Sequence, residues 1–143
     1  NWHMIGNLQS NKAKRVAQLF EVIHTLSTDG QLREIEKSEK VIDGFIEVNI
    51  GEEPQKPALY TKSLDEYHQH ALNSKQVNFL GLMTIGPLVE SPELMRPHFR
   101  RLKTLNEELG GTCLSMGMSG DFSVAIQEGA THVRVGSAIF GSR

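Results

Sequence analysis

Two hydrophobic patterns alternate along the chain. In one, apolar residues recur every three to four positions, as Val16, Leu19 and Phe20 do, which is typical of an amphipathic helix. In the other, short apolar segments end at glycine, proline or small polar residues, and residues 45–50 are apolar enough for a strand covered on both faces. We expect strands at residues 2–6, 22–26, 45–50, 79–85, 114–118 and 131–135, and helices at residues 12–20, 32–40, 64–72, 97–109 and 121–128.

This order amounts to six βα units in succession and predicts an α/β fold with a parallel sheet and helical crossovers. A closed barrel of the TIM type has eight strands and about 250 residues, so the chain is short by about two units. It opens on a strand-like segment without an initiator methionine, and we expect it to start in mid-domain. An open doubly wound sheet is the alternative, but no Gly-x-Gly-x-x-Gly follows the first strand.

Composition narrows the class of protein further. With 143 residues, 38% hydrophobic and 22% charged, the chain is typical of one soluble domain. The net charge of −2, without a basic block, gives no support for a nucleic-acid partner. Cys113 is the only cysteine, which suits a reducing compartment. We find no apolar stretch of about 20 residues and no signal peptide, so we expect a cytoplasmic protein without a membrane partner.

Small polar pairs follow the last two predicted strands. Met118-Ser119 ends one strand and Gly136-Ser137 ends the other, so backbone N–H groups and hydroxyls are presented where a helix could begin. Such positions suit a phosphate group, and parallel barrels often bind phosphate after their last two strands. Ordinary helix caps and turn glycines are the alternative interpretation for either pair alone.

The ends of the predicted strands supply the other candidate site residues. A guanidinium at Arg134, between Val133 and Val135, is costly to bury without an acceptor. The acceptor is either a protein group in a structural salt bridge or a bound ligand. The six histidines show no metal-binding spacing, so we expect no metal site. Met118 stands where a nucleophile elbow needs serine. The complete set of strand-end candidates is His3, Asn49, Met83, Ser119, Arg134, Gly136 and Ser137.

Four segments together resemble the pyridoxal phosphate homeostasis protein family, also called the YggS/PROSC family. They are residues 2–12 (WHMIGNLQSNK), 81–83 (GLM), 114–119 (LSMGMS) with Asp121, and 133–141 (VRVGSAIFG). The resemblance runs over nearly the whole chain. It implies a barrel akin to the N-terminal domain of alanine racemase, here truncated to about its last six βα units over residues 1–143. It also implies a protein that binds pyridoxal 5′-phosphate (PLP) without established turnover and buffers or delivers it.

Carried over by position, the resemblance implies roles for particular residues. Met118, Ser119, Gly136 and Ser137 would hold the phosphate, the first and third through backbone N–H, and Arg134 would face the pyridine nitrogen. Asn49 and Met83 would line the pocket. The lysine that forms the family's Schiff base with PLP would precede Asn1, so no catalytic residue is assigned in this chain.

Two other functions remain open from the sequence. A PLP-dependent amino-acid racemase of this barrel type needs a second catalytic base, and neither Tyr60 nor Tyr67 stands at a predicted strand end. A phosphosugar barrel enzyme would need strand-end lysines or carboxylates, which we do not find. For the PLP carrier we expect PLP-requiring apo-enzymes as possible partners, and a monomer or weak homodimer.

Overall fold

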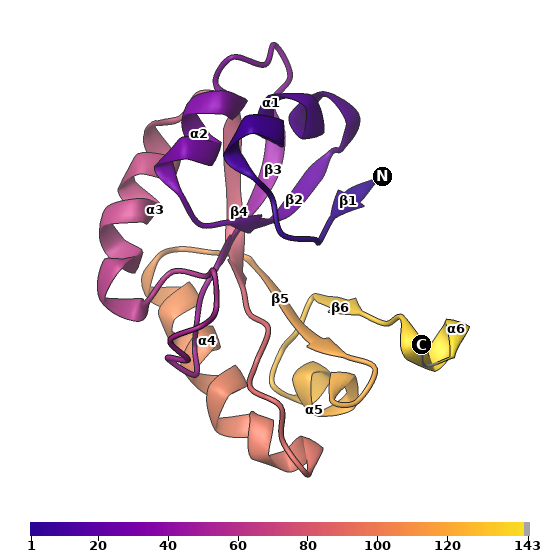
Figure 1. Cartoon of the computed structure of the whole chain (residues 1–143). Helices are drawn as coiled ribbons and strands as arrows, with labels where there is room; N and C mark the ends of the chain where they lie inside the picture. Colours follow the sequence, from indigo (N-terminus) through magenta and orange to yellow (C-terminus); the bar gives the residue numbers. More distant parts are fainter. Residues whose placement is uncertain (142–143) are drawn as a thin grey trace.

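All six strands of the computed structural model, which describes residues 1–141, form one parallel sheet in the order of the sequence, β1 to β6 (Figure 1). The helices α2, α3 and α4 follow the outer side of this sheet, and α6 lies on its other side. The strands are β1 (His3–Met4), β2 (Val22–Leu26), β3 (Ile42–Glu47), β4 (Val77–Met83), β5 (Cys113–Met118) and β6 (His132–Arg134). Six consecutive parallel strands are the predicted arrangement of βα units.

Helices connect each strand to the next. The α-helices are α1 (Ser10–Leu19), α2 (Asp29–Ile35), α3 (Leu64–Asn73), α4 (Arg96–Glu108), α5 (Phe122–Gln127) and α6 (Ser137–Phe140). Two short 3-10 helices, η1 (Thr61–Ser63) and η2 (Pro92–Met95), precede α3 and α4. In the part of the chain that the structure describes, no helix has the length and hydropathy to cross a bilayer.

The prediction for α2 was wrong at both ends, because the helix occupies Asp29–Ile35 rather than 32–40. A capping box starts it: the Thr28 hydroxyl accepts from the Gln31 N–H, and the Gln31 side chain accepts from the Thr28 N–H. Leu32 and Ile35 are buried, whereas the following residues offer almost no apolar side chain to extend the packed face. The strand β3 likewise starts and ends earlier than predicted, at Ile42 and Glu47 instead of residues 45 and 50.

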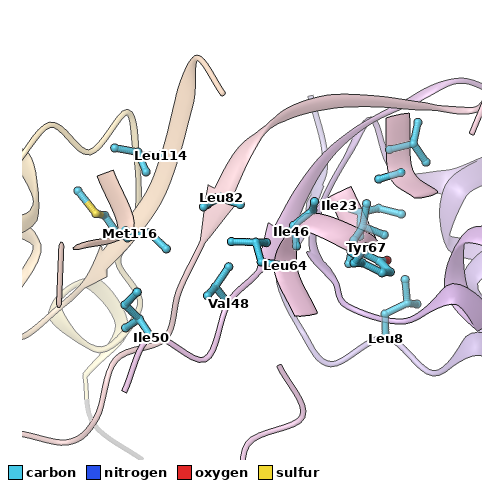
Figure 2. Packing of buried hydrophobic residues seen from close by; sticks show 14 of the residues in the cluster. Leu8, Ile23, Ile46, Val48, Ile50, Leu64, Tyr67, Leu82, Leu114 and Met116 are labelled. Carbon is cyan, nitrogen blue, oxygen red and sulfur yellow. The ribbon is translucent and has the colours of Figure 1, made fainter. Parts of the chain in front are cut away.

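The main core lies between the sheet and the helices. Ile23, Ile46 and Leu82, on three neighbouring strands, belong to the same buried cluster as Leu64 and Tyr67 of α3 (Figure 2). Because successive strand residues point to opposite faces, the neighbours of these side chains face the inner side of the sheet. A smaller apolar cluster of Val22, Phe45 and Met83 lies there.

Two glycines allow close approaches that shape the β5 end of the sheet. At Gly81, a Cβ atom would lie 1.9 Å from the carbonyl oxygen of Cys113 on the neighbouring strand. Gly117 has a φ of +94°, and a Cβ there would lie 2.6 Å from Cβ of Ala125 in α5. Glycine is therefore required where β5 meets β4 and where α5 packs beneath the end of β5.

Candidate functional site

The inner face of the sheet bears polar side chains that surround a cavity of about 710 Å³. His24 follows the core residue Ile23 in β2, and Arg134 follows Val133, which is exposed, in β6. Unlike the outer face, the inner face thus combines apolar packing with groups that can bind a polar ligand. The cavity lining includes His3, Ile5, His24, Ile85, Arg134 and Gly136.

Arg134 is held by two neutral acceptors. Its Nη1 donates to the Ser115 hydroxyl and its Nη2 donates to the Thr84 carbonyl oxygen, both at 2.7 Å. Burial lowers the pKa of Arg134, and the carboxylates of Glu47 and Asp121 oppose that shift. The prediction that this guanidinium has a partner is confirmed, but among residues 1–141 that partner is not a salt-bridging carboxylate. Arginine has five N–H donors, so three remain for the cavity.

The ends of β5 and β6 converge as predicted. β5 and β6 pair in parallel with Met118 opposite Arg134. Beyond this pair, the Ser119 hydroxyl accepts hydrogen bonds from the backbone N–H groups of Gly136 (3.2 Å) and Ala138 (3.1 Å). Two N–H groups at the start of α6 therefore already point at one oxygen atom.

Ser137 and Met118, which were also predicted to hold the phosphate group, differ in whether their polar groups are free to bind it. Ser137 is the first residue of α6 and is exposed, next to the N–H groups that Ser119 binds. The backbone N–H of Met118, in contrast, donates to Oδ1 of Asp121 at 2.7 Å. An anion would have to displace that carboxylate to use the Met118 N–H, so the structure does not present it as a free donor.

Asn49 and Met83 are not brought to the lining of this cavity. Asn49 lies two residues beyond β3 and is fully buried; its side-chain amide donates to the Glu53 carbonyl and accepts from the Glu53 N–H. It stabilises the loop after β3. Met83 is fully buried and packs with Val22 and Phe45 on the inner face.

Sequence reasoning missed His24, Ser115 and Glu47. His24 and Ser115 are almost fully buried, and the Ser115 hydroxyl lies 2.7 Å from Nδ1 of His24. Burial, helped by the charges of His3, Arg134 and His132, lowers the pKa of His24 to about 3. Burial also raises the pKa of Glu47, although Arg134 and Lys56 oppose the shift. The available signal was a titratable residue within a mostly apolar strand, such as His24 in Val22–Leu26.

Comparison with known proteins identifies the family of the chain. The chain matches the family model described as alanine racemase, N-terminal domain, over residues 2–143. It is 44% identical over 152 residues to the pyridoxal phosphate homeostasis protein of Aquifex aeolicus (strain VF5), with 99% of this chain and 67% of that protein covered. To the protein of the same name from Vibrio alginolyticus it is 36% identical over 151 residues, with 99% and 65% covered.

A solved structure is similar as well. PipY of Synechococcus elongatus PCC7942, determined with PLP bound, superposes with a TM-score of 0.81 at 28% identity, covering 99% of this chain and 70% of that one. The chain therefore belongs to the alanine racemase N-terminal domain family, and within it to the pyridoxal phosphate homeostasis proteins. It spans about two-thirds of the length of the curated relatives it matches. The predicted fold class, a TIM-type barrel represented by six of its βα units, is confirmed.

Proposed function

We propose that the protein binds PLP at the ends of β5 and β6 and takes part in PLP homeostasis by buffering or delivering the cofactor. The observation that carries this proposal is the Ser119 hydroxyl, which occupies the meeting point of the Gly136 and Ala138 N–H groups. A phosphate oxygen would take the place of that hydroxyl at the two N–H groups, and the Ser119 hydroxyl would then donate to the phosphate. A Cβ at Gly136 would meet no atom of the described residues within 4 Å, so the residues present fit a phosphate group.

Arg134 supports the same ligand from inside the cavity. Its remaining N–H donors can bind the ring nitrogen of PLP, and a permanently charged guanidinium there disfavours protonation of that nitrogen. PLP supplies an electron sink for carbanion chemistry when bound, and an unprotonated ring weakens that sink. The arrangement therefore suits retention of the cofactor more than broad catalysis.

The name and bound ligand of the relatives support this function for the whole protein. The Aquifex and Vibrio relatives are called pyridoxal phosphate homeostasis proteins, and PipY was solved with PLP. We propose that the 143 residues form part of a PLP-binding barrel. The first two βα units of that barrel, with the lysine that attaches the cofactor, would belong to the third of the relatives' length that these residues do not span. PLP-requiring apo-enzymes are the partners that this role implies, and a monomer or weak homodimer is the assembly we expect.

The racemase alternative lacks a tyrosine at the cavity among the described residues. The Tyr67 hydroxyl is buried and donates to the Thr28 carbonyl at 3.2 Å, while Tyr60 lies just before η1. Neither lines the cavity with Arg134. We therefore propose a protein without catalytic turnover.

Titration of the full-length protein with PLP and with pyridoxal tests the proposed phosphate site. Ser119→Ala removes the hydroxyl that organises the Gly136 and Ala138 N–H groups, and together with Ser137→Ala it should weaken PLP binding about tenfold. Pyridoxal lacks the phosphate, so its weaker binding should stay the same. Ser123→Ala, an exposed serine of α5, is the matched control. If the double variant keeps the wild-type preference for PLP over pyridoxal, the phosphate binds elsewhere.

A further inference from the structure

A chain of hydrogen bonds leads from Arg134 across the inner face of the sheet, and three of its four members line the cavity. Arg134 Nη1 lies 2.7 Å from the Ser115 hydroxyl, which lies 2.7 Å from Nδ1 of His24. Nε2 of His24 lies 2.9 Å from Nδ1 of His3. Four side chains from β6, β5, β2 and β1 are thus connected in one line across the inner face.

The direction of this chain follows from its first member. A guanidinium can only donate, so the Ser115 oxygen accepts from Arg134. Ser115 is fully buried, and its own proton has one remaining partner among the described residues, Nδ1 of His24. Were His24 to donate instead, the Ser115 proton would be buried without an acceptor, which is unfavourable. His24 therefore carries its proton on Nε2 and donates it to Nδ1 of His3.

The surroundings of His24 favour the neutral ring that this direction requires. The ring stacks on Phe45 with 4.5 Å between ring centres. The rings of His3 and His132 lie 5.1 and 5.8 Å from it, and Glu47 and Arg134 are the charged groups of the neighbouring inner face. Burial lowers the pKa of His24 to about 3, in agreement with its position as acceptor from Ser115.

We propose that Ser115 and His24 are positioning residues for PLP binding: they fix the Arg134 guanidinium through a one-way hydrogen-bond chain, so that its free N–H donors stay directed at the ring nitrogen of the cofactor. The inference rests on the proposed function, because it gives Arg134 its ligand. Thr84 holds the other side of the guanidinium through its carbonyl oxygen, which no side-chain substitution removes. Of the two contacts that hold the guanidinium, only the one with Ser115 can be removed by a side-chain substitution.

Two variants interrupt the chain, and each has a matched control. Ser115→Ala removes the link between Arg134 and His24, and His24→Phe keeps a ring of similar shape without nitrogen atoms. Ser74 and His68 are also buried, but their side-chain polar atoms have no hydrogen-bond partner among residues 1–141. Ser74→Ala and His68→Phe therefore remove the same chemical groups without affecting Arg134.

The test compares, in the full-length protein, the affinity for PLP with that for an analogue in which CH replaces the ring nitrogen. The wild type should prefer PLP by about tenfold, as expected for one hydrogen bond from a charged donor. Ser115→Ala and His24→Phe should bring this ratio close to one, and the two control variants should keep it. A purely structural effect would instead weaken both ligands equally.

A second measurement does not depend on the cofactor. Long-range 1H–15N NMR spectra of the apo-protein at pH 7 should show His24 protonated at Nε2 and bare at Nδ1, with no titration down to pH 5. Protonation at Nδ1 overturns the proposal whether or not PLP binds. Unchanged discrimination in Ser115→Ala and His24→Phe also overturns it and leaves the proposed function intact. Failure of the wild type to bind PLP rejects the proposed function, while the NMR result still decides the direction of the chain.

Discussion

The hydroxyl of Ser119 accepts a hydrogen bond from the backbone N–H of Gly136 at 3.2 Å, which joins the ends of two neighbouring parallel strands. The same oxygen also accepts from Ala138. In a parallel sheet the carboxyl ends of the strands meet at one edge, so residues 17 positions apart in the sequence come together at the corner where we propose that the phosphate binds. The site is a property of the pairing between β5 and β6.

Replacing Arg134 by lysine should separate charge from geometry. Lysine keeps the positive charge but is a point donor that cannot bind Ser115, Thr84 and a ligand in fixed directions at once. We expect PLP affinity to fall about tenfold and the preference for PLP over its CH-for-nitrogen analogue to disappear. Equilibrium binding of both ligands measures this. An unchanged preference in Arg134→Lys would show that the guanidinium does not face the ring nitrogen.

The neutral state of His24 should make the folded protein sensitive to acid. Its pKa is lowered to about 3 in the folded state, whereas an unfolded histidine has a pKa of about 6.5. Between these values the unfolded chain binds one more proton, so stability is lost as the pH falls below about 6.5, at about 1.4 kcal/mol per pH unit. Burial also lowers the pKa of His68 and His132, which adds to the loss in the same direction.

Urea unfolding at several pH values between 7 and 4 measures this effect. In His24→Gln the free energy of unfolding should fall less steeply with decreasing pH. Its slope should be smaller by the contribution of about one bound proton, which is about 1.4 kcal/mol per pH unit. His70 is a suitable control, because an exposed hydrogen bond to Asp29 raises its pKa and its contribution has the opposite sign. Identical slopes in wild type and His24→Gln would contradict a neutral buried His24.

Gly81→Ala should destabilise the sheet strongly. The added methyl group would lie 1.9 Å from the Cys113 carbonyl oxygen, which is backbone and cannot move without breaking the pairing of β4 with β5. We expect a loss of about 3 kcal/mol or more in the free energy of unfolding. Gly120→Ala is the control, since nothing lies within 4 Å of a Cβ there. Equal stability of the two variants in urea would show that β4 and β5 are farther apart.

Sequence patterns were sufficient for the order of elements and for the corner between Ser119 and Gly136. Short apolar strands separated by amphipathic helices determine a parallel sheet, and consecutive strands of such a sheet end at the same edge. The bounds of α2 were also within reach, because Thr28 and Gln31 form a recognisable Thr-x-x-Gln capping box. They were missed because the charged residues after Ile35 were read as part of the helix.

The partners of Arg134 could not be predicted in this way. Alternation shows that Ser115 and Arg134 both face inward, but their contact depends on the register of β5 against β6, which shifts between Ser115 and Met118. The occupation of the Met118 N–H by Asp121 depends in the same way on a local turn. The contact of Arg134 with Ser115 arises from tertiary packing and the contact of Met118 with Asp121 from a local turn, and no period in the sequence encodes either.

The central claim is that the N–H groups of Gly136 and Ala138 bind the phosphate of PLP. Backbone 1H–15N NMR of the full-length protein measures this directly, with PLP, pyridoxal and inorganic phosphate added in separate titrations. We expect the amide signals of Gly136 and Ala138 to shift with PLP, to shift in the same direction with inorganic phosphate, and to stay nearly unchanged with pyridoxal. PLP binding that leaves both amide signals in place would contradict it.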